Sequence, residues 1–208
     1  SGTTSTIEIL RCDISAVSRA GSFALRVVFV SAGACASVTG SALVSACCDA
    51  IAGCSCTSFH YGVYQQYLQG DAATLTLANN NVTVNGKRGY GLYFVGALTT
   101  TKVKVTNVDI TSALRPVWFD AVAGGSIAVS GGTWSTDRAI YFLGVISAAA
   151  QIHIRGTSMT IASASNRAGV QFRAAISGAS TVIIEKITVL GAAKHGVYFV
   201  DTVTSAEV

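Results

Sequence analysis

Apolar and polar residues alternate with a period of two in short runs along most of the chain, and Gly, Asn or Ser separates the runs. This alternation is typical of β-strands that bury one face and expose the other. No stretch has the period of an amphipathic helix, about 3.6 residues. The pattern therefore predicts an all-β fold.

One kind of run recurs at intervals of 23 to 30 residues. It consists of a small residue, an apolar residue, a third residue that is usually aromatic, and Phe. Its copies are Gly91-Leu92-Tyr93-Phe94, Pro116-Val117-Trp118-Phe119, Ala139-Ile140-Tyr141-Phe142, Gly169-Val170-Gln171-Phe172 and Gly196-Val197-Tyr198-Phe199. A weaker sixth copy is Gly62-Val63-Tyr64-Gln65, and a seventh is expected at Val27-Val28-Phe29.

A second kind of run lies between these copies and contains two alternating segments joined by a turn. Its copies span residues 7–15, 75–84, 103–111, 127–135, 152–160 and 182–189. A repeat of short strands at this spacing is typical of a parallel β-helix, in which one unit buries its apolar face only when neighbours stack on it. We expect a single domain over 1–208 with about seven coils, irregular and Cys-containing over 1–60 and regular over 61–208.

The phase of the repeat assigns each side chain to a face, because neighbouring residues of a strand point to opposite sides. The Phe of each copy is expected inside, where aromatic burial is strongly stabilising. The residue before it is then outside. This outward column reads Tyr93, Trp118, Tyr141, Gln171 and Tyr198, with Tyr64 one coil earlier. A contiguous aromatic stripe on the exterior indicates a contact surface.

Basic residues precede this stripe in each coil. They are Lys87, Arg88, Arg115, Arg138, Arg167, Lys194 and His195. Arg side chains bind carboxylates and sulfates in a bidentate manner, and aromatic rings stack on sugars. The predicted ligand-binding residues, for an extended surface glycan that carries anionic groups, are Tyr93, Trp118, Tyr141, Tyr198, Arg88, Arg115 and Arg138. The same residue types are enriched in protein interfaces, so packing against a second subunit is an open alternative.

Composition restricts the function classes. Only 12% of the residues are charged, about half the usual ~25%, and 50% are hydrophobic, which excludes a disordered chain and a long coiled coil. The formal net charge of +4 is too small to indicate nucleic-acid binding. The uncharged stretch from Val27 to Cys48 is long enough to cross a bilayer, but its polar positions and its fit to the repeat favour buried strands. No membrane insertion, nucleic acid, cofactor or metal is expected.

The six Cys residues all lie within the first 56 positions, at Cys12, Cys35, Cys47, Cys48, Cys54 and Cys56. Their spacing differs from that of zinc sites. Buried thiols and disulfides are both compatible with this arrangement. Cys12 takes the place of Val108 in the repeat, which favours a buried thiol at that position.

Catalytic patterns are sparse. A glycoside hydrolase needs two nearby carboxylates, and by repeat phase no two acids share a column on neighbouring coils. A pair formed between subunits would not be visible in one sequence. His60, His153 and His195 are isolated and fit neither a catalytic triad nor a metal site.

Over residues 7–205 the coil pattern resembles the right-handed parallel β-helix superfamily, which includes pectate-lyase-like enzymes, phage tailspikes and tail fibres, and surface adhesins. The low charge and the Ser, Thr, Gly, Ala and Val surface resemble a receptor-binding tip or an adhesin most. The resemblance implies a right-handed coil, an extracellular or virion-surface location, attachment to surface polysaccharide and a homo-oligomer, with a trimer favoured. No signature motif matches, so no catalytic residue is carried over.

Two other functions stay open from the sequence. One is a polysaccharide depolymerase, a hydrolase or lyase, with its site between subunits. The other is a purely structural fibre shaft. Ice binding would need a regular column of Thr residues, which the repeat phase does not predict.

Overall fold

The computed structural model describes residues 6–17, 22–29, 34–46, 59–67, 73–85, 89–112, 114–136, 140–162, 168–191, 194–204 and 206–208. All regular secondary structure in these ranges is β-strand, and the strands within each sheet pair in parallel. The expectation of an all-β chain with parallel strands is therefore confirmed.

The strands form three sheets. Sheet A consists, in spatial order, of β1 (Thr6–Leu10), β4 (Cys35–Thr39), β7 (Thr74–Ala78), β10 (Lys102–Thr106), β13 (Ser126–Ser130), β17 (Gln151–Arg155) and β20 (Thr181–Glu185). Sheet B consists of β2 (Asp13–Val17), β5 (Ala42–Ala46), β8 (Asn81–Asn85), β11 (Asp109–Ser112), β14 (Thr133–Thr136), β18 (Ser158–Ile161) and β21 (Thr188–Gly191). Sheet C consists of β3 (Ser22–Phe29), β6 (His60–Tyr67), β9 (Gly89–Leu98), β12 (Arg115–Ala123), β15 (Ile140–Phe142), β19 (Ala168–Phe172) and β22 (His195–Phe199), and the short β16 (Ile146–Ser147) also pairs with β12.

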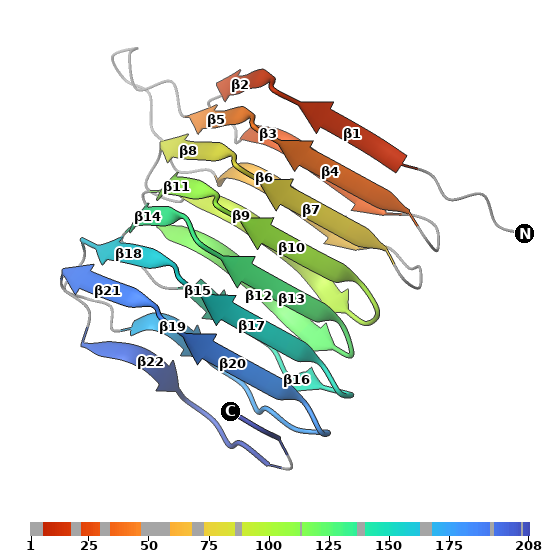
Figure 1. Ribbon diagram of the computed structural model, residues 1–208, viewed down its shortest axis with the longest axis vertical. Helices are drawn as coiled ribbons and strands as arrows, with labels where there is room; N and C mark the ends of the chain where they lie inside the picture. The colour runs from red at the N-terminus through yellow and green to blue at the C-terminus, as the bar shows by residue number, and fades with distance from the viewer. Residues whose placement is uncertain are drawn as a thin grey trace, which may run out of the picture.

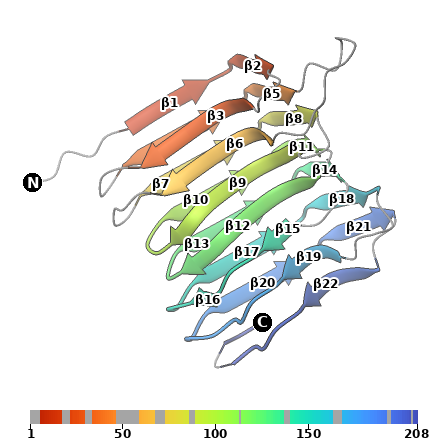
Figure 2. The ribbon, with the colours of Figure 1, turned by 180° about the vertical axis from the view of Figure 1, so that it is seen from behind.

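The chain visits the sheets in turn, so that β1, β2 and β3 belong to sheets A, B and C, and β4 returns to sheet A beside β1. Successive circuits stack along the long axis of the molecule, from the red N-terminal strands to the blue C-terminal strands in Figure 1. Figure 2 shows the same stack from behind, where the sheet C strands β3, β6, β9 and β12 follow one another. This path is consistent with a parallel β-helix.

The Phe residues of the repeat form one internal column. Phe94, Phe119, Phe142 and Phe172 are each 1% exposed. Successive rings from Phe94 to Phe199 stack with centroids 4.6–4.9 Å apart and planes within 11° of parallel. In-register pairing places each Phe directly on the next. The predicted inward Phe column is confirmed.

Sheets A and B supply the rest of the core through every second residue. In the middle strands of sheet A these inward residues are buried, as in Val103, Ile127 and Ile152. In sheet B, Trp134 is fully buried, and its indole Nε1–H donates to the Val108 carbonyl at 2.8 Å. Trp134 is thus a core residue, in contrast to Trp118.

A left-handed residue turns the chain from sheet A to sheet B in every circuit. Seven residues at this corner have φ between 49° and 68°: Arg11, Gly40, Asn79, Asn107, Gly131, Gly156 and Lys186. Gly and Asn tolerate this conformation best, because it crowds the Cβ of other residues. The corner explains why Gly and Asn separate the alternating runs of the sequence.

Two sequence predictions about the first coils are wrong. The seventh copy of the Phe-bearing run is Leu25-Arg26-Val27, which pairs with Val63-Tyr64-Gln65, so residue 27 takes the place expected for Phe29. Cys12 does correspond in position to Val108, but it is exposed and not disulfide-bonded. It lies between β1 and β2, which are end strands of sheets A and B. Cys47, Cys48, Cys54 and Cys56 lie outside the described residues.

The uncharged stretch from Val27 to Cys48 contributes the end of β3 and all of β4 and β5 within the described ranges. The strand interpretation of this stretch is confirmed there. In the part of the chain that the structure describes, no helix is long and apolar enough to cross a membrane.

Thr does repeat in one column, contrary to the expectation from repeat phase. On the outer face of sheet B, Thr83, Thr111, Ser135 and Thr160 lie in register. Val44 precedes this column and Leu190 follows it. The column is therefore short and interrupted by Ser135.

Candidate functional site

The outward residues of the Phe-bearing runs form a column on the outer face of sheet C, as predicted. The register aligns Arg26, Tyr64, Tyr93, Trp118, Tyr141, Gln171 and Tyr198. Tyr64, Tyr93 and Trp118 are partly exposed, whereas Tyr141 is buried, with 8% of its surface exposed. The column is therefore continuous in space but varies in accessibility.

A second aromatic column, which sequence reasoning missed, runs beside the first. It contains Phe23, Tyr61 and Tyr90, which pair in register, and Arg115 follows them. Phe59 flanks it, with its ring centroid 6.3 Å from that of Tyr61 and 5.8 Å from that of Tyr90. A signal was present in the sequence, because Tyr61-Gly-Val-Tyr64 and Tyr90-Gly-Leu-Tyr93 are the same motif.

The two columns share a face although their residues are three positions apart. In a regular strand this spacing would place Tyr90 and Tyr93 on opposite faces. Here both intervening residues face the core: Leu92 is fully buried, and a β-carbon on Gly91 would point at Ile110. Gly91 allows this close approach because it has no side chain. The Tyr90 and Tyr93 rings consequently meet edge to face at 5.0 Å.

We name the combined surface the aromatic ladder, which comprises Phe23, Phe59, Tyr61, Tyr64, Tyr90, Tyr93, Trp118 and Tyr141. Neighbouring Tyr rings of one column are nearly parallel, as in Tyr61–Tyr90 at 5.5 Å and 17° and Tyr64–Tyr93 at 5.7 Å and 16°. These separations exceed the contact distance of about 3.5–4.0 Å between carbon atoms, so the rings are offset. The Trp118 ring is tilted by 32° from Tyr93 and by 35° from Tyr141. Each half-buried ring therefore leaves part of its face and edge uncovered.

Arg115 packs within the ladder. Its guanidinium lies 4.1 Å from the Trp118 ring centroid and 3.9 Å from that of Tyr141, and its side chain is 8% exposed. This is cation–π geometry. At the other end, the Arg26 guanidinium lies 5.9 Å from the Tyr64 ring centroid and is exposed. One Arg is thus buried among the ladder rings, and a second, exposed Arg borders the β3 end of the ladder.

Asp120 fixes the orientation of Trp118. Its carboxylate accepts the indole Nε1–H of Trp118 at 2.7 Å and the backbone N–H of Gly96 at 3.1 Å. The register between β9 and β12 shifts at this point, which is a β-bulge. Bulges re-aim side chains, and here the bulge turns Asp120 toward the ladder.

Burial changes the acidity of two ladder phenols. Desolvation raises the pKa of Tyr61 to about 12, and the neighbouring Tyr90, Tyr64 and Asp120 add to the effect. Desolvation also raises the pKa of Tyr93, and the negative charge of Asp120 raises it further. Both hydroxyls therefore keep their protons at neutral pH and are able to donate and accept hydrogen bonds.

The remaining predicted site residues are more dispersed. Tyr198 is 36% exposed and stacks on His195 with centroids 5.1 Å apart, but Gln171, which is 7% exposed, separates it from Tyr141. Arg88 and Arg138 lie outside the described residues. The structure thus brings Tyr93, Trp118, Tyr141 and Arg115 together and leaves Tyr198 apart from them.

The ladder offers offset ring surfaces, ring edges and Tyr hydroxyls beside one fixed carboxylate. Such a surface suits a ligand that has both apolar faces and hydroxyl groups, or the aromatic-rich surface of another protein. Comparisons of the chain with protein-family models, with curated proteins and with solved structures gave no match. The function is therefore inferred from the chemistry of the ladder.

Proposed function

We propose that the chain is a surface-attachment β-solenoid, of the tailspike or adhesin type, that binds surface polysaccharide along its aromatic ladder. Its coil is right-handed, as nearly all crossovers between parallel strands are, with about seven coils. It acts on a cell or virion surface within a homo-oligomeric fibre, with a trimer favoured. The residues assigned to sugar contact are Tyr93, Trp118, Tyr64 and Tyr61.

The observation that carries this proposal is the ladder itself. Eight aromatic side chains gather on one face of sheet C, although aromatic residues make up only 8% of the chain. Scattered exposed apolar residues are ordinary, but a contiguous patch marks a contact surface. A ladder that follows the axis of the stack suits an extended ligand more than a compact one.

The half-buried state of the rings supports a sugar ligand. Partly exposed rings held in place by their neighbours lose little conformational freedom on binding. Their uncovered portions contact the C–H faces of a sugar, and the Tyr hydroxyls bond to its hydroxyl groups. Asp120 and Arg115 are engaged with ladder rings, so they hold these rings in position.

A second candidate is contact between subunits, which the more exposed rings favour. Phe23 and Phe59 are 42% and 43% exposed, and neither carries a polar group for a sugar. Such side chains are typical of protein interfaces. A groove between subunits would use the Phe residues for assembly and the Tyr residues for sugar.

One paired measurement tests the proposal. Wild-type protein and the variants Tyr93→Ala and Trp118→Ala are applied to a glycan array, and their masses are measured by sedimentation equilibrium. The matched control is Thr111→Ala, which truncates an exposed side chain on the outer face of sheet B. We expect both ring variants to lose glycan binding by about tenfold or more, a typical effect for an anchor residue, while the control binds as wild type.

The outcomes separate the candidates. Loss of glycan signal at unchanged mass supports sugar contact by the ladder. A fall in mass for the ring variants, with no glycan signal from any protein, supports the subunit interface. Unchanged binding and unchanged mass in both ring variants would remove the ladder from either role.

A further inference from the structure

A second surface with different chemistry lies on the outer face of sheet A, away from the ladder on sheet C. Three neighbouring strands contribute to it: β10, β13 and β17, whose register is continuous. The outward residues of β13 are Ser126, Ala128 and Ser130, and all three are short. A hollow of about 390 Å³ lies over β13, β17 and the next strand, β20, with Ser126, Ala128, Gln151, His153, Thr181 and Ile183 among its lining residues. Strand β10 lies beside this hollow, next to β13.

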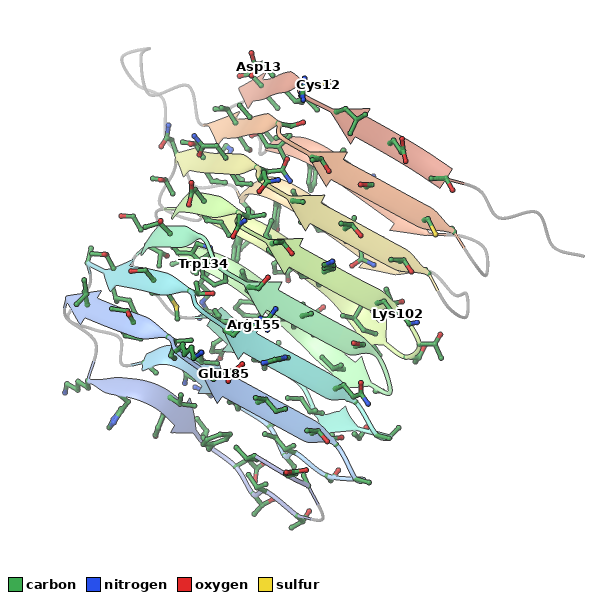
Figure 3. All side chains as sticks on the ribbon, in the orientation of Figure 1. Cys12, Asp13, Lys102, Trp134, Arg155 and Glu185 are labelled. Carbon is green, nitrogen blue, oxygen red and sulfur yellow. The ribbon has the colours of Figure 1, made fainter. Side chains whose placement is uncertain are left out.

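Cationic side chains border this hollow on two sides. Lys102 and Lys104 project from β10, and both are exposed. Arg155 projects from β17 and is also exposed, with the half-buried His153 two residues before it. Figure 3 labels Lys102 and Arg155 on this face. Because strands lie about 4.8 Å apart, the two cationic strands are separated by roughly 10 Å across β13.

Two of the described acidic residues lie at this surface. One is the exposed Glu207, which bridges in register to Thr181. The other is Glu185 on β20, which pairs in register with Arg155. Its carboxylate Oε1 lies 3.0 Å from Nε2 of His153, and Figure 3 labels Glu185 beside Arg155. The outward side chains of β10 and β13 include no acid. Glu185 therefore holds the His153 ring at one edge of the hollow and lies beside Arg155. Lys102 and Lys104, in register with the lining residues Ser126 and Ala128, have no acid on their own strand or on β13.

We propose that this surface, named the cationic hollow and comprising Lys102, Lys104, Ser126, Ala128, Gln151, His153 and Arg155, binds a sulfated or carboxylated oligosaccharide. Lys102, Lys104 and Arg155 contact the anionic groups, and Arg155 is suited to bidentate contact with a planar carboxylate or a sulfate. Ser126 and Gln151, with Thr181 beside them, both donate and accept hydrogen bonds, as sugar hydroxyls require. The small Ala128 leaves room for the sugar ring.

Charge and side-chain type together favour this ligand over single-stranded nucleic acid. Binding of single strands depends on aromatic platforms for the bases, and the outward residues of β10 and β13 include no aromatic ring. The inference does not depend on the ladder, because the two surfaces belong to different sheets. An anionic polysaccharide able to reach both faces would be bound at two positions on one molecule.

The test uses fluorescence polarisation with a labelled heparin hexasaccharide and a labelled hexagalacturonate as the sulfated and carboxylated probes. The test variant is Lys102→Gln/Lys104→Gln. The matched control is Lys186→Gln/Lys194→Gln, which removes the same charge from two exposed positions outside the hollow. All variants change exposed side chains, and thermal unfolding checks that each one is folded.

We expect wild type to bind at least one anionic probe and to lose affinity as salt rises. The test variant should bind that probe at least about tenfold more weakly, as the loss of one or two charge-assisted hydrogen bonds implies, while the control should change by less than about twofold. Thr111→Ala, which truncates an exposed side chain on the outer face of sheet B, should also bind as wild type. Equal losses in test and control, equal binding of neutral maltohexaose, or equal binding of a six-nucleotide oligothymidine would each overturn the proposal.

Discussion

Gly91 and Gly196 occupy the same position of the repeat but have opposite surroundings. A β-carbon at Gly91 would lie 2.5 Å from Ile110 Cγ2 and 2.5 Å from the Pro116 carbonyl oxygen, whereas one at Gly196 would have no atom within 4 Å. The atoms that crowd Gly91 belong to the next circuit of the chain, to β12 and to the sheet B segment that precedes it. Gly196 lies in β22, the last strand of sheet C. The requirement for glycine therefore comes from stacking of coils and not from the local turn.

This relationship predicts different effects for the same substitution. Gly91→Ala should lower the free energy of unfolding by about 1–3 kcal/mol, because the added methyl overpacks the junction of two coils. Gly196→Ala should change it by less than about 0.5 kcal/mol, as at an open surface position. Urea unfolding followed by circular dichroism measures both. Equal losses in the two variants would show that glycine is needed here for backbone conformation.

The fold was largely readable from the sequence because stacking imposes one residue type per column. The Phe that ends each copy of the run marked the length of one coil. The alternation in the runs between these copies indicated which side chains face the core and which face outward. The first coil was misread by two residues because position 27 is Val and position 65 is Gln, so the Phe that marks the column in later coils is missing. The exposure of Cys12 was predicted wrongly for another reason. Position in the repeat shows which way a side chain points, but its exposure also depends on whether a neighbouring coil covers that side chain.

The candidate site was predictable in part. The outward column of Tyr93, Trp118 and Tyr141 followed from strand alternation. The column of Phe23, Tyr61 and Tyr90 did not, because it depends on two successive residues that both face inward at Gly91 and Leu92. Alternation rules cannot anticipate such a break. The burial of Arg115 between two rings was also hidden, since it depends on packing between coils.

The internal Phe column should dominate stability. Phe142→Ala removes a ring that stacks on both Phe119 and Phe172, at 4.9 and 4.7 Å, and we expect a loss of about 3–5 kcal/mol. The control is Leu143→Ala, an adjacent side chain that is 42% exposed, with an expected change within about 0.5 kcal/mol. Chemical denaturation compares the two. A loss below about 1 kcal/mol for Phe142→Ala would contradict the stacked column, given typical costs of core truncation.

The left-handed corner makes a prediction about Asn107, whose φ is 49°. Asn107→Val should destabilise by about 1–2 kcal/mol, because a β-branched residue is strained in this conformation. Asn107→Gly should be tolerated, because Gly adopts positive φ without that strain. Thermal unfolding of both variants is the measurement. A stable Asn107→Val variant would mean that the corner is not held in the left-handed region.

The raised pKa of Tyr61 links stability to alkaline pH. The folded state holds this phenolic proton more tightly than the unfolded state, whose Tyr pKa is about 10. The stability that this pKa difference contributes is fully present below about pH 10. It is lost as pH rises through the Tyr61 pKa of the folded state, about 12. Tyr61→Phe removes this group, so its stability should fall less than that of wild type over this window. Urea unfolding at several alkaline pH values tests this, and parallel decline of the two proteins would contradict it.

Replacement of the buried Gln65 by an apolar residue is expected to stabilise the fold. It pairs in register with Phe94 and is 1% exposed, so it occupies the inward column in place of a Phe. Among the described residues, neither its side-chain oxygen nor its nitrogen has a hydrogen-bond partner. A buried amide without partners costs about 1–3 kcal/mol, and Met has a similar length with no such group. Gln65→Met should therefore raise the free energy of unfolding by about 1–3 kcal/mol. The exposed Gln151→Met serves as control, with a change within about 0.5 kcal/mol. Destabilisation by Gln65→Met would indicate that the amide is satisfied in solution.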